Sequence, residues 1–243
     1  MVAPTRVGTE TIQNGSTSRS AESFSHTTTA DTDILLVCVF IEGNEAVSGT
    51  PTFDGNDLTL IRDTGSTGAA ADVRAYVYGQ LAPGAVTGTL AVSFTSTVNP
   101  DAVVCINYKD TDSASIAAAT NFINEDINTT ASSTGVHSSG GSSGNTLLVA
   151  GAGQGNDMQH ASVDNSFAEV WDEQTGISSS QDFGHIGAEL TTGLPSAVTI
   201  TYGATDQNTS VLIELVAAAA GADDLATKRV NLEGDGMLMV RGG

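Results

Sequence analysis

Residues Asp31–Gly43, which read DTDILLVCVFIEG, decide the fold of this chain. The eight residues from Ile34 to Ile41 are all apolar. The run is too short to cross a bilayer, which takes about 20 apolar residues in a helix. Its length and its Val, Ile and Phe content are typical of a β-strand. A strand with one face in water alternates apolar and polar residues. This one does not, so the sequence predicts that both of its faces are covered.

Two other segments lack the alternation, AVVCINY (102–108) and SVLIELV (210–216). A sheet of such strands with one face in water would expose a larger apolar patch than monomers usually carry. We therefore expect either the ends of the chain or another subunit to cover it.

Self-similarity divides the chain into two halves. Segment 23–44 and segment 134–156 each place a His in a Ser/Thr-rich strand, followed by a polar turn, a Leu-Leu-Val strand, and Gly and Asn. TFDGNDLTLIRDTGS (52–66) likewise resembles SVDNSFAEVWDEQTG (162–176). Five strand-like segments recur in the same order, at an offset of roughly 110 residues. The pattern indicates an internal duplication.

Alternation elsewhere also predicts strands. Leu90, Val92 and Phe94 point one way in LAVSFT, and turns are marked by Asp54-Gly55-Asn56-Asp57 and Pro83-Gly84. Only SASIAAATNF (113–122) suggests a helical turn. We predict an all-β fold, an antiparallel two-sheet jelly-roll-like sandwich built from two similar halves. The expected boundaries are an N-terminal arm over 1–20, a sandwich over 21–217 (halves about 21–112 and 113–217), and a C-terminal docking tail over 218–243.

From about Ser20 to Ala217 this order of strands resembles the jelly-roll, concanavalin-like domains of phage structural proteins and bacterial surface proteins. The turn Leu81-Ala82-Pro83-Gly84 and the strand Thr89–Ser93 carry the resemblance. It implies the sandwich fold, and the matching motifs carry no catalytic residues.

Charge is sparse and one-sided. The 243 residues hold 28 Asp and Glu against 8 Lys and Arg, a net charge of −20, and only Lys109 and Lys228 are lysines. Such a surface disfavours nucleic acid and anionic membranes as partners. It resists aggregation and suits saline surroundings. Cys38 and Cys105 each lie in an apolar run, which is typical of buried free thiols; a disulfide stays open if their strands are neighbours.

Several patterns resemble chemical sites, and a structural interpretation competes with each. Gly140–Gly144 matches G-x-S-x-G but precedes a strand, whereas a nucleophile elbow follows one. His26 and His137 occupy matching places in the two halves, which favours a shared structural role. Weak Ca²⁺ candidates are Asp54, Asn56 and Asp57, or Asn156 and Asp157, where hairpin turn chemistry is the alternative.

Carbohydrate chemistry has few candidates. Glu169, Trp171 and Glu173 would share one strand face, with Asp172 on the other, as a carboxylate pair beside an aromatic ring. Trp171, Tyr76 and Tyr78 are candidate glycan-stacking residues, with core packing as the alternative. We expect no enzyme and no resident cofactor or metal.

The C-terminal tail is the expected interface. It holds three of the eight basic residues and an apolar segment, and the interface candidates are Lys228, Arg229, Met237, Leu238, Met239, Val240 and Arg241. A final strand or a frayed end is the alternative to docking.

These features lead to an expectation about function. The first 20 residues hold no apolar stretch typical of a signal peptide, yet the composition resembles an exported surface protein. A virus particle, made in the host cytoplasm and released, reconciles the two. We expect a non-enzymatic virion structural protein of a tailed phage, a capsid decoration or cement protein whose partners are the major capsid protein, other virion subunits and copies of itself. The alternatives are a tail or fibre component, or a bacterial surface adhesin or carbohydrate-binding module with a glycan partner.

Overall fold

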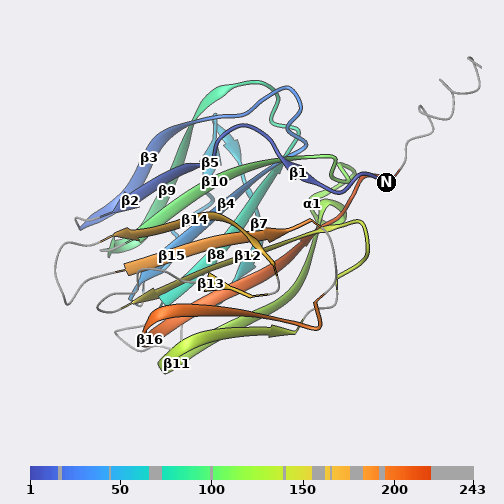
Figure 1. Cartoon of the computed structure of the whole chain (residues 1–243). Helices are drawn as coiled ribbons and strands as arrows, with labels where there is room; N and C mark the ends of the chain where they lie inside the picture. Colours follow the sequence, from blue (N-terminus) through green and yellow to red (C-terminus); the bar gives the residue numbers. More distant parts are fainter. Residues whose placement is uncertain are drawn as a thin grey trace, which may run out of the picture.

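The computed structural model of the chain describes residues 1–15, 18–43, 45–65, 73–98, 101–138, 141–154, 162–164, 166–175, 183–191 and 195–219. These residues form a nearly all-β fold with one short helix (Figure 1). The elements are, in order, β1 (Thr5–Arg6), β2 (Thr11–Gly15), β3 (Arg19–Thr27), β4 (Ile34–Glu42), β5 (Thr52–Phe53), β6 (Asn56–Asp57), β7 (Thr59–Asp63), β8 (Val73–Leu81), β9 (Thr87–Val98), β10 (Asp101–Lys109), α1 (Ile116–Ala119), β11 (Thr120–Ser138), β12 (Thr146–Gln154), β13 (Ser162–Val163), β14 (Ala168–Thr175), β15 (Phe183–Leu190) and β16 (Ala197–Leu215). The predicted all-β class is confirmed, and so is the helical turn within 113–122.

The first half, β1 to β10, forms two layers. Its inner sheet has the order β10-β4-β8-β7, with β1 and β2 added along the far side of β10. Its outer sheet has the order β3-β9-β5-β6. All pairings are antiparallel. The N-terminal residues are therefore part of the first inner sheet, where β2 pairs with β10 from Thr11 to Gly15.

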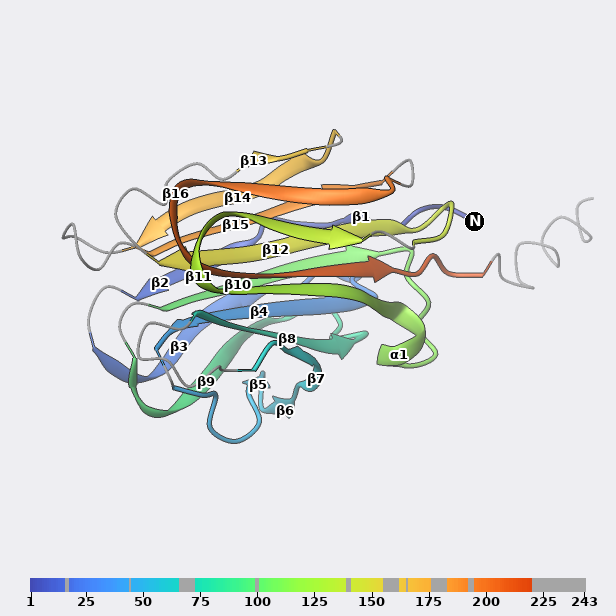
Figure 2. The same ribbon diagram turned by 90° about the horizontal axis from the view of Figure 1, so that it is seen from below.

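The second half repeats this arrangement with fewer, longer strands. Its sheet runs β11-β16-β12-β15-β14, so β16-β12-β15-β14 repeats the order β10-β4-β8-β7. The 19-residue strands β11 and β16 turn from one layer into the other (Figure 2). The later part of β16 pairs with β12, while its first part pairs with β13 and with the end of β11. The duplication predicted from the sequence is thus present as a repeated topology.

The apolar sequence of strand β4 is explained by its position, because the strand contributes side chains to two cores. Its odd-numbered residues, such as Leu35 and Val37, pack toward the outer sheet of the first half. Its even-numbered residues, such as Leu36 and Phe40, pack against β12, β15 and β16 of the second half. All eight residues from Ile34 to Ile41 are fully buried. Because successive side chains of a strand point to opposite faces, a strand between two cores has no polar position.

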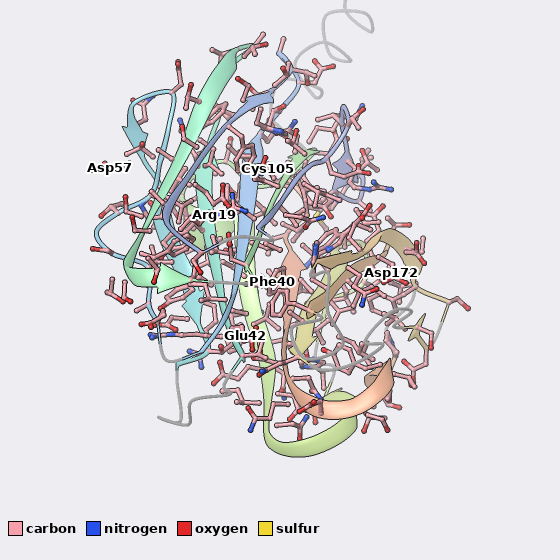
Figure 3. The ribbon with its side chains drawn as sticks, turned by 90° about the vertical axis from the view of Figure 1, so that its left-hand side faces the viewer. Arg19, Phe40, Glu42, Asp57, Cys105 and Asp172 are labelled. Atoms are coloured by element: carbon pink, nitrogen blue, oxygen red, sulfur yellow. The ribbon has the colours of Figure 1, made fainter. Side chains whose placement is uncertain are left out.

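The second half of the chain therefore covers the second face of β4. The expectation that the chain ends or another subunit would cover it was wrong. The two inner sheets, one from each half, pack face to face as the predicted sandwich, and each half adds an outer layer (Figure 2). Phe40 lies between the halves (Figure 3). Periodicity showed that both faces were buried but not what buried them.

The halves pack as an approximate twofold pair. Strand β2 contacts β14 at one margin of the sandwich, and β11 contacts β7 at the other. By topology β7 corresponds to β14, and the start of β11 corresponds to β2. Even the irregularities repeat, since a β-bulge lies at Ile61 in β7 and at Val170 in β14.

Polar contacts connect the halves at one end of the molecule. The Tyr108 hydroxyl donates to Glu189 Oε2 at 3.0 Å, and Arg6 Nε donates to Glu189 Oε1 at 3.0 Å. The Thr146 hydroxyl donates to the carbonyl of Pro4 at 2.6 Å. The N-terminal residues thus contact both halves.

The two cysteines lie on neighbouring strands without forming a disulfide. Cys38 faces Val104 and Cys105 faces Val37 across the β4–β10 pair, so their side chains lie on opposite faces of the sheet. Each sits in a different core, and both are buried free thiols. Burial raises the pKa of Cys38 to about 12.

Candidate functional site

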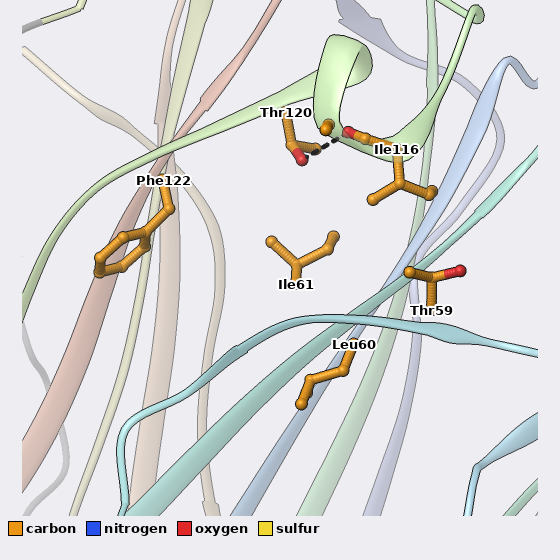
Figure 4. A pocket seen from close by; sticks show the side chains of 7 residues that line it. Thr59, Leu60, Ile61, Ile116, Thr120 and Phe122 are labelled. Carbon is orange, nitrogen blue, oxygen red and sulfur yellow. Dashed lines mark hydrogen bonds between the residues drawn. The ribbon is translucent and has the colours of Figure 1, made fainter.

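An apolar groove opens at the margin of the sandwich where β7, α1 and β11 meet (Figure 4). Its volume is about 270 Å³, and its lining residues are Thr59, Leu60, Ile61, Ile116, Ala117, Thr120 and Phe122. Ile61, Ile116 and Phe122 are also partly buried against the core between the halves. The groove is therefore an open margin of that core.

Local sequence features build the walls of the groove. Ser115 caps α1 by accepting a hydrogen bond from the Ala118 N–H at 3.0 Å, which fixes Ile116 and Ala117 on one side. The Thr120 hydroxyl donates to the Ile116 carbonyl at 2.8 Å and ends the helix. At Gly79 a Cβ would lie 3.0 Å from both Ile61 and Ile116, so the absence of a side chain there lets the two walls approach.

A polar bridge between the halves lies beside the Phe122 wall of the groove. Arg62 Nε donates to Glu125 Oε2 at 2.7 Å, and the guanidinium lies 4.4 Å from the centre of the Phe122 ring. Hydrogen bonds to Glu125 raise the pKa of Arg62, so the guanidinium stays charged. The bridge connects β7 to β11, and Ile61 points from β7 toward Ile116 and Phe122 (Figure 4).

The chain leaves the fold beside this groove. The Val216 N–H donates to the Ala119 carbonyl at 2.9 Å, and the Ala218 N–H donates to the Asp110 carbonyl at 2.9 Å. The end of β16 and α1 lie at the same end of the molecule in Figures 1 and 2. All seven interface residues predicted in the tail, from Lys228 to Arg241, lie outside the described residues, so the interface there stays a prediction.

The weak Ca²⁺ candidates lie in a hairpin turn. Asp54 and Gly55, with φ of 50° and 76°, connect β5 to β6, as expected of a tight hairpin with two left-handed central residues. Asp54, Asn56 and Asp57 are exposed, and Asn56 Nδ2 donates to the Asp54 carbonyl at 3.2 Å. The arrangement supports turn chemistry at this place. Asn156 and Asp157 lie outside the described residues.

The paired histidines have the shared structural role that their positions suggested. His26 Nε2 lies 3.1 Å from Asn107 Oδ1 on β10, and His137 Nε2 lies 2.7 Å from Ser210 Oγ on β16. Each histidine thus connects an outer-layer strand to the last strand of its own half. Burial lowers the pKa of both, that of His137 to about 4, so both are neutral at pH 7.

The contact between Ser210 and His137 resembles a nucleophile and its base. Both side chains are fully buried, so a substrate has no route to the hydroxyl. His185 is equally enclosed, stacked on Phe40, and burial lowers its pKa to about 3. His160 lies outside the described residues.

The stretch that matches G-x-S-x-G belongs to a turn before a strand. The Ser142 N–H donates to the Glu214 carboxylate, to which Asn145 Nδ2 also donates at 2.8 Å. The segment leads directly into β12. Gly140 lies outside the described residues.

The predicted carbohydrate residues are packed in the interior. Trp171 and Tyr76 are 3% exposed and Tyr78 is 5% exposed, so none presents a ring face to solvent. The prediction that Glu169, Trp171 and Glu173 share one face was wrong, because the bulge at Val170 interrupts the alternation and turns Trp171 inward. Trp171 packs so closely on Gly187 that a Cβ there would lie 2.0 Å from the indole ring.

A buried acidic pair lies where the two layers of the first half meet. Asp101 is fully buried and Glu22 is 4% exposed, and Arg19 forms ion pairs with both. Burial, with the charge of Glu22 second, raises the pKa of Asp101 to about 8. The protonated carboxyl can then hydrogen-bond to Glu22. No sequence pattern indicated this pair, since Asp101 and Glu22 lie far apart in the chain.

Within the described part of the chain, no cluster of three or more His, Cys, Asp or Glu side chains is arranged to hold a metal ion. In the same residues no helix is long and apolar enough to span a membrane. Comparison of the chain with protein-family models, with curated proteins and with solved structures gave no match.

Proposed function

We propose that this chain is a non-enzymatic structural protein of a tailed-phage virion, a capsid decoration or cement protein. The proposal rests on a contrast, among the described residues, between buried reactive side chains and an exposed apolar groove. The buried histidines, cysteines and acidic pair are enclosed in the fold, whereas an apolar groove lies open beside the point where the C-terminal segment leaves. Such an arrangement favours binding to other protein subunits over catalysis.

The architecture supports a mechanical role. The inner sheets of the two halves share one continuous core. A mechanical load applied to one half is therefore transmitted to the other through packed side chains. The strong negative charge keeps free copies apart in solution. Weak contacts through the sandwich surface and the terminal segments would then add up on a lattice of shell subunits.

The test is the number of copies of this chain per particle, measured by quantitative mass spectrometry of purified virions against the major shell protein. Hundreds of copies per particle are expected for a decoration protein. A few to a dozen copies would assign it to the tail or a fibre instead. Complete absence from particles would contradict the virion role and favour a bacterial surface adhesin.

A further inference from the structure

We propose that, in the free protein, the chain's own C-terminal segment Met237–Val240 binds in the apolar groove between β7, α1 and β11. The inference concerns the isolated chain and does not depend on the virion role. It rests on the shape of the groove, on the place where the chain leaves the fold, and on the composition of the residues that follow.

The groove has the properties of a side-chain binding site. Its volume of about 270 Å³ lies just below the roughly 300–1,000 Å³ of small-molecule pockets, so it suits a few apolar side chains. Leu60 on its rim is 50% exposed, one of the few large apolar side chains with such exposure among the described residues. Its inner wall continues the core between the halves, so an apolar occupant would extend that core.

The following segment has the matching composition. Met237-Leu238-Met239-Val240 is a run of four apolar residues in an otherwise polar tail. In extended form, alternate side chains of such a run point the same way, so two of them can enter the groove together. Methionine adapts well to an irregular apolar surface.

Length and position favour the chain's own tail over that of a second copy. Ala217 bridges Thr111 and residue 216 is bonded to Ala119, so the tail starts beside one wall of the groove. The 17 residues 220–236 that lead to Met237 reach up to about 60 Å when extended. A tether of this kind supplies an effective concentration on the order of millimolar, far above that of free copies in dilute solution.

Charge acts in the same direction. Residues 220–243 contain four acidic and three basic residues, a net charge of −1. Subtracting these from the 28 acidic and 8 basic residues of the whole chain leaves 24 and 5, a net charge of −19 for residues 1–219. Two bodies of this charge repel each other, whereas the nearly neutral tail is repelled little by its own body, so charge disfavours the exchange of tails between copies.

A disulfide trapping experiment on the full chain tests the proposal. In the pair Leu60→Cys/Leu238→Cys one thiol replaces a groove residue that is 50% exposed. In the control pair Val136→Cys/Leu238→Cys it replaces a residue of similar exposure, 53%, on β11. Cys38 and Cys105 are fully buried and do not compete. Under mild oxidation we expect an intrachain disulfide in the first pair at least tenfold faster than in the control. Equal rates would overturn the proposal, and a disulfide between chains would assign the groove to the tail of a second copy.

Methionine oxidation gives a second measurement that needs no engineered thiol. Met1 is 81% exposed and serves as the internal reference. With hydrogen peroxide, we expect Met237 and Met239 to oxidise several-fold more slowly than Met1. Leu60→Glu should bring them to the rate of Met1, and Val136→Glu should not. Rates equal to that of Met1 in the wild-type chain, or protection that survives Leu60→Glu, would contradict docking in this groove.

Discussion

At the scale of single residues, the interior of this protein holds polar groups whose partners come from distant parts of the chain. His26 and His137 bond to the last strands of their own halves, and Arg19 faces both Glu22 and Asp101. The two histidines were predicted to be equivalent because they sit in similar sequences. The Asp101–Glu22 contact could not be predicted from the sequence. The burial of these two side chains depends on tertiary packing, which produces no periodic pattern in the sequence.

The acidic pair predicts a pH dependence of stability. The pKa of Asp101 is raised by burial to about 8, well above its ordinary value of 3.8. Its contribution to the free energy of unfolding is therefore fully present below about pH 4 and is lost as the pH rises through 8, with a slope of up to about 1.4 kcal/mol per pH unit. Urea unfolding of the wild type and of Asp101→Asn between pH 5 and 9 checks this, and the variant should have the flatter profile.

A control separates Asp101 from other titrating groups. Burial also raises the pKa of Glu42 to about 7, which adds a slope of the same sign to both proteins and cancels in their difference. Asp57→Asn, at an exposed turn position, should leave the wild-type profile unchanged. Parallel profiles for the wild type and Asp101→Asn would show that Asp101 titrates normally.

At the scale of elements, the sequence predicted most strands and the order in which they repeat. Alternation identified β9 and the first part of β16, and unbroken apolar runs identified β4 and β10. Two features escaped prediction for physical reasons. The bulge at Val170 shifts every later side chain of β14 by one position. The pairing of β2 with β10 joins segments that lie far apart in the chain, and no sequence similarity indicates that they pair.

The groove escaped prediction for a related reason. Leu60, Ile61 and Phe122 have the sequence pattern of ordinary core residues, and only the arrangement of three separate elements leaves them at an open margin. The one local signal was the run SASIAAATNF, whose Ser115 caps α1. The predicted helical turn between the two halves was therefore the one sequence feature near this site, and no residue type by itself indicated a groove.

Strand β4 predicts how the two halves are coupled. Phe40 and Phe53 are both fully buried, but Phe40 packs between the halves and Phe53 within the first half. Either Phe→Ala change should cost about 3–5 kcal/mol. Phe40→Ala should lower amide hydrogen-exchange protection in β12 and β15 as well as in β4, whereas Phe53→Ala should lower it in β5 and β9 and spare β12. Loss of protection confined to the first half in both variants would mean that the halves unfold independently.

At the scale of the whole molecule, four layers are formed from a duplicated unit, and the duplication was legible in the sequence. The sequence analysis identified the wrong partner for the apolar β4 face, because the second copy of the unit, and not a chain end or another subunit, covers it. The contacts that join β7 to β11 and β2 to β14 follow from packing one half against the other in twofold fashion. An arrangement of this kind buries inside one chain the type of surface that would otherwise require a dimer.

The charge of the whole chain predicts how its stability responds to salt. With a net charge of −20, repulsion between surface carboxylates opposes the compact state, and screening shortens its range from about 10 Å at 0.1 M to about 3 Å at 1 M salt. The free energy of unfolding, measured with urea at pH 7, should therefore rise by roughly 1 kcal/mol or more between 0.05 and 1 M NaCl. A variant with the exposed acidic residues Asp54, Asp57, Glu169 and Glu173 changed to their amides should be more stable at low salt and should gain less from added NaCl. If the two proteins gain equally, the salt effect comes from stronger burial of apolar surface rather than from screened repulsion, and the acidic surface serves solubility alone.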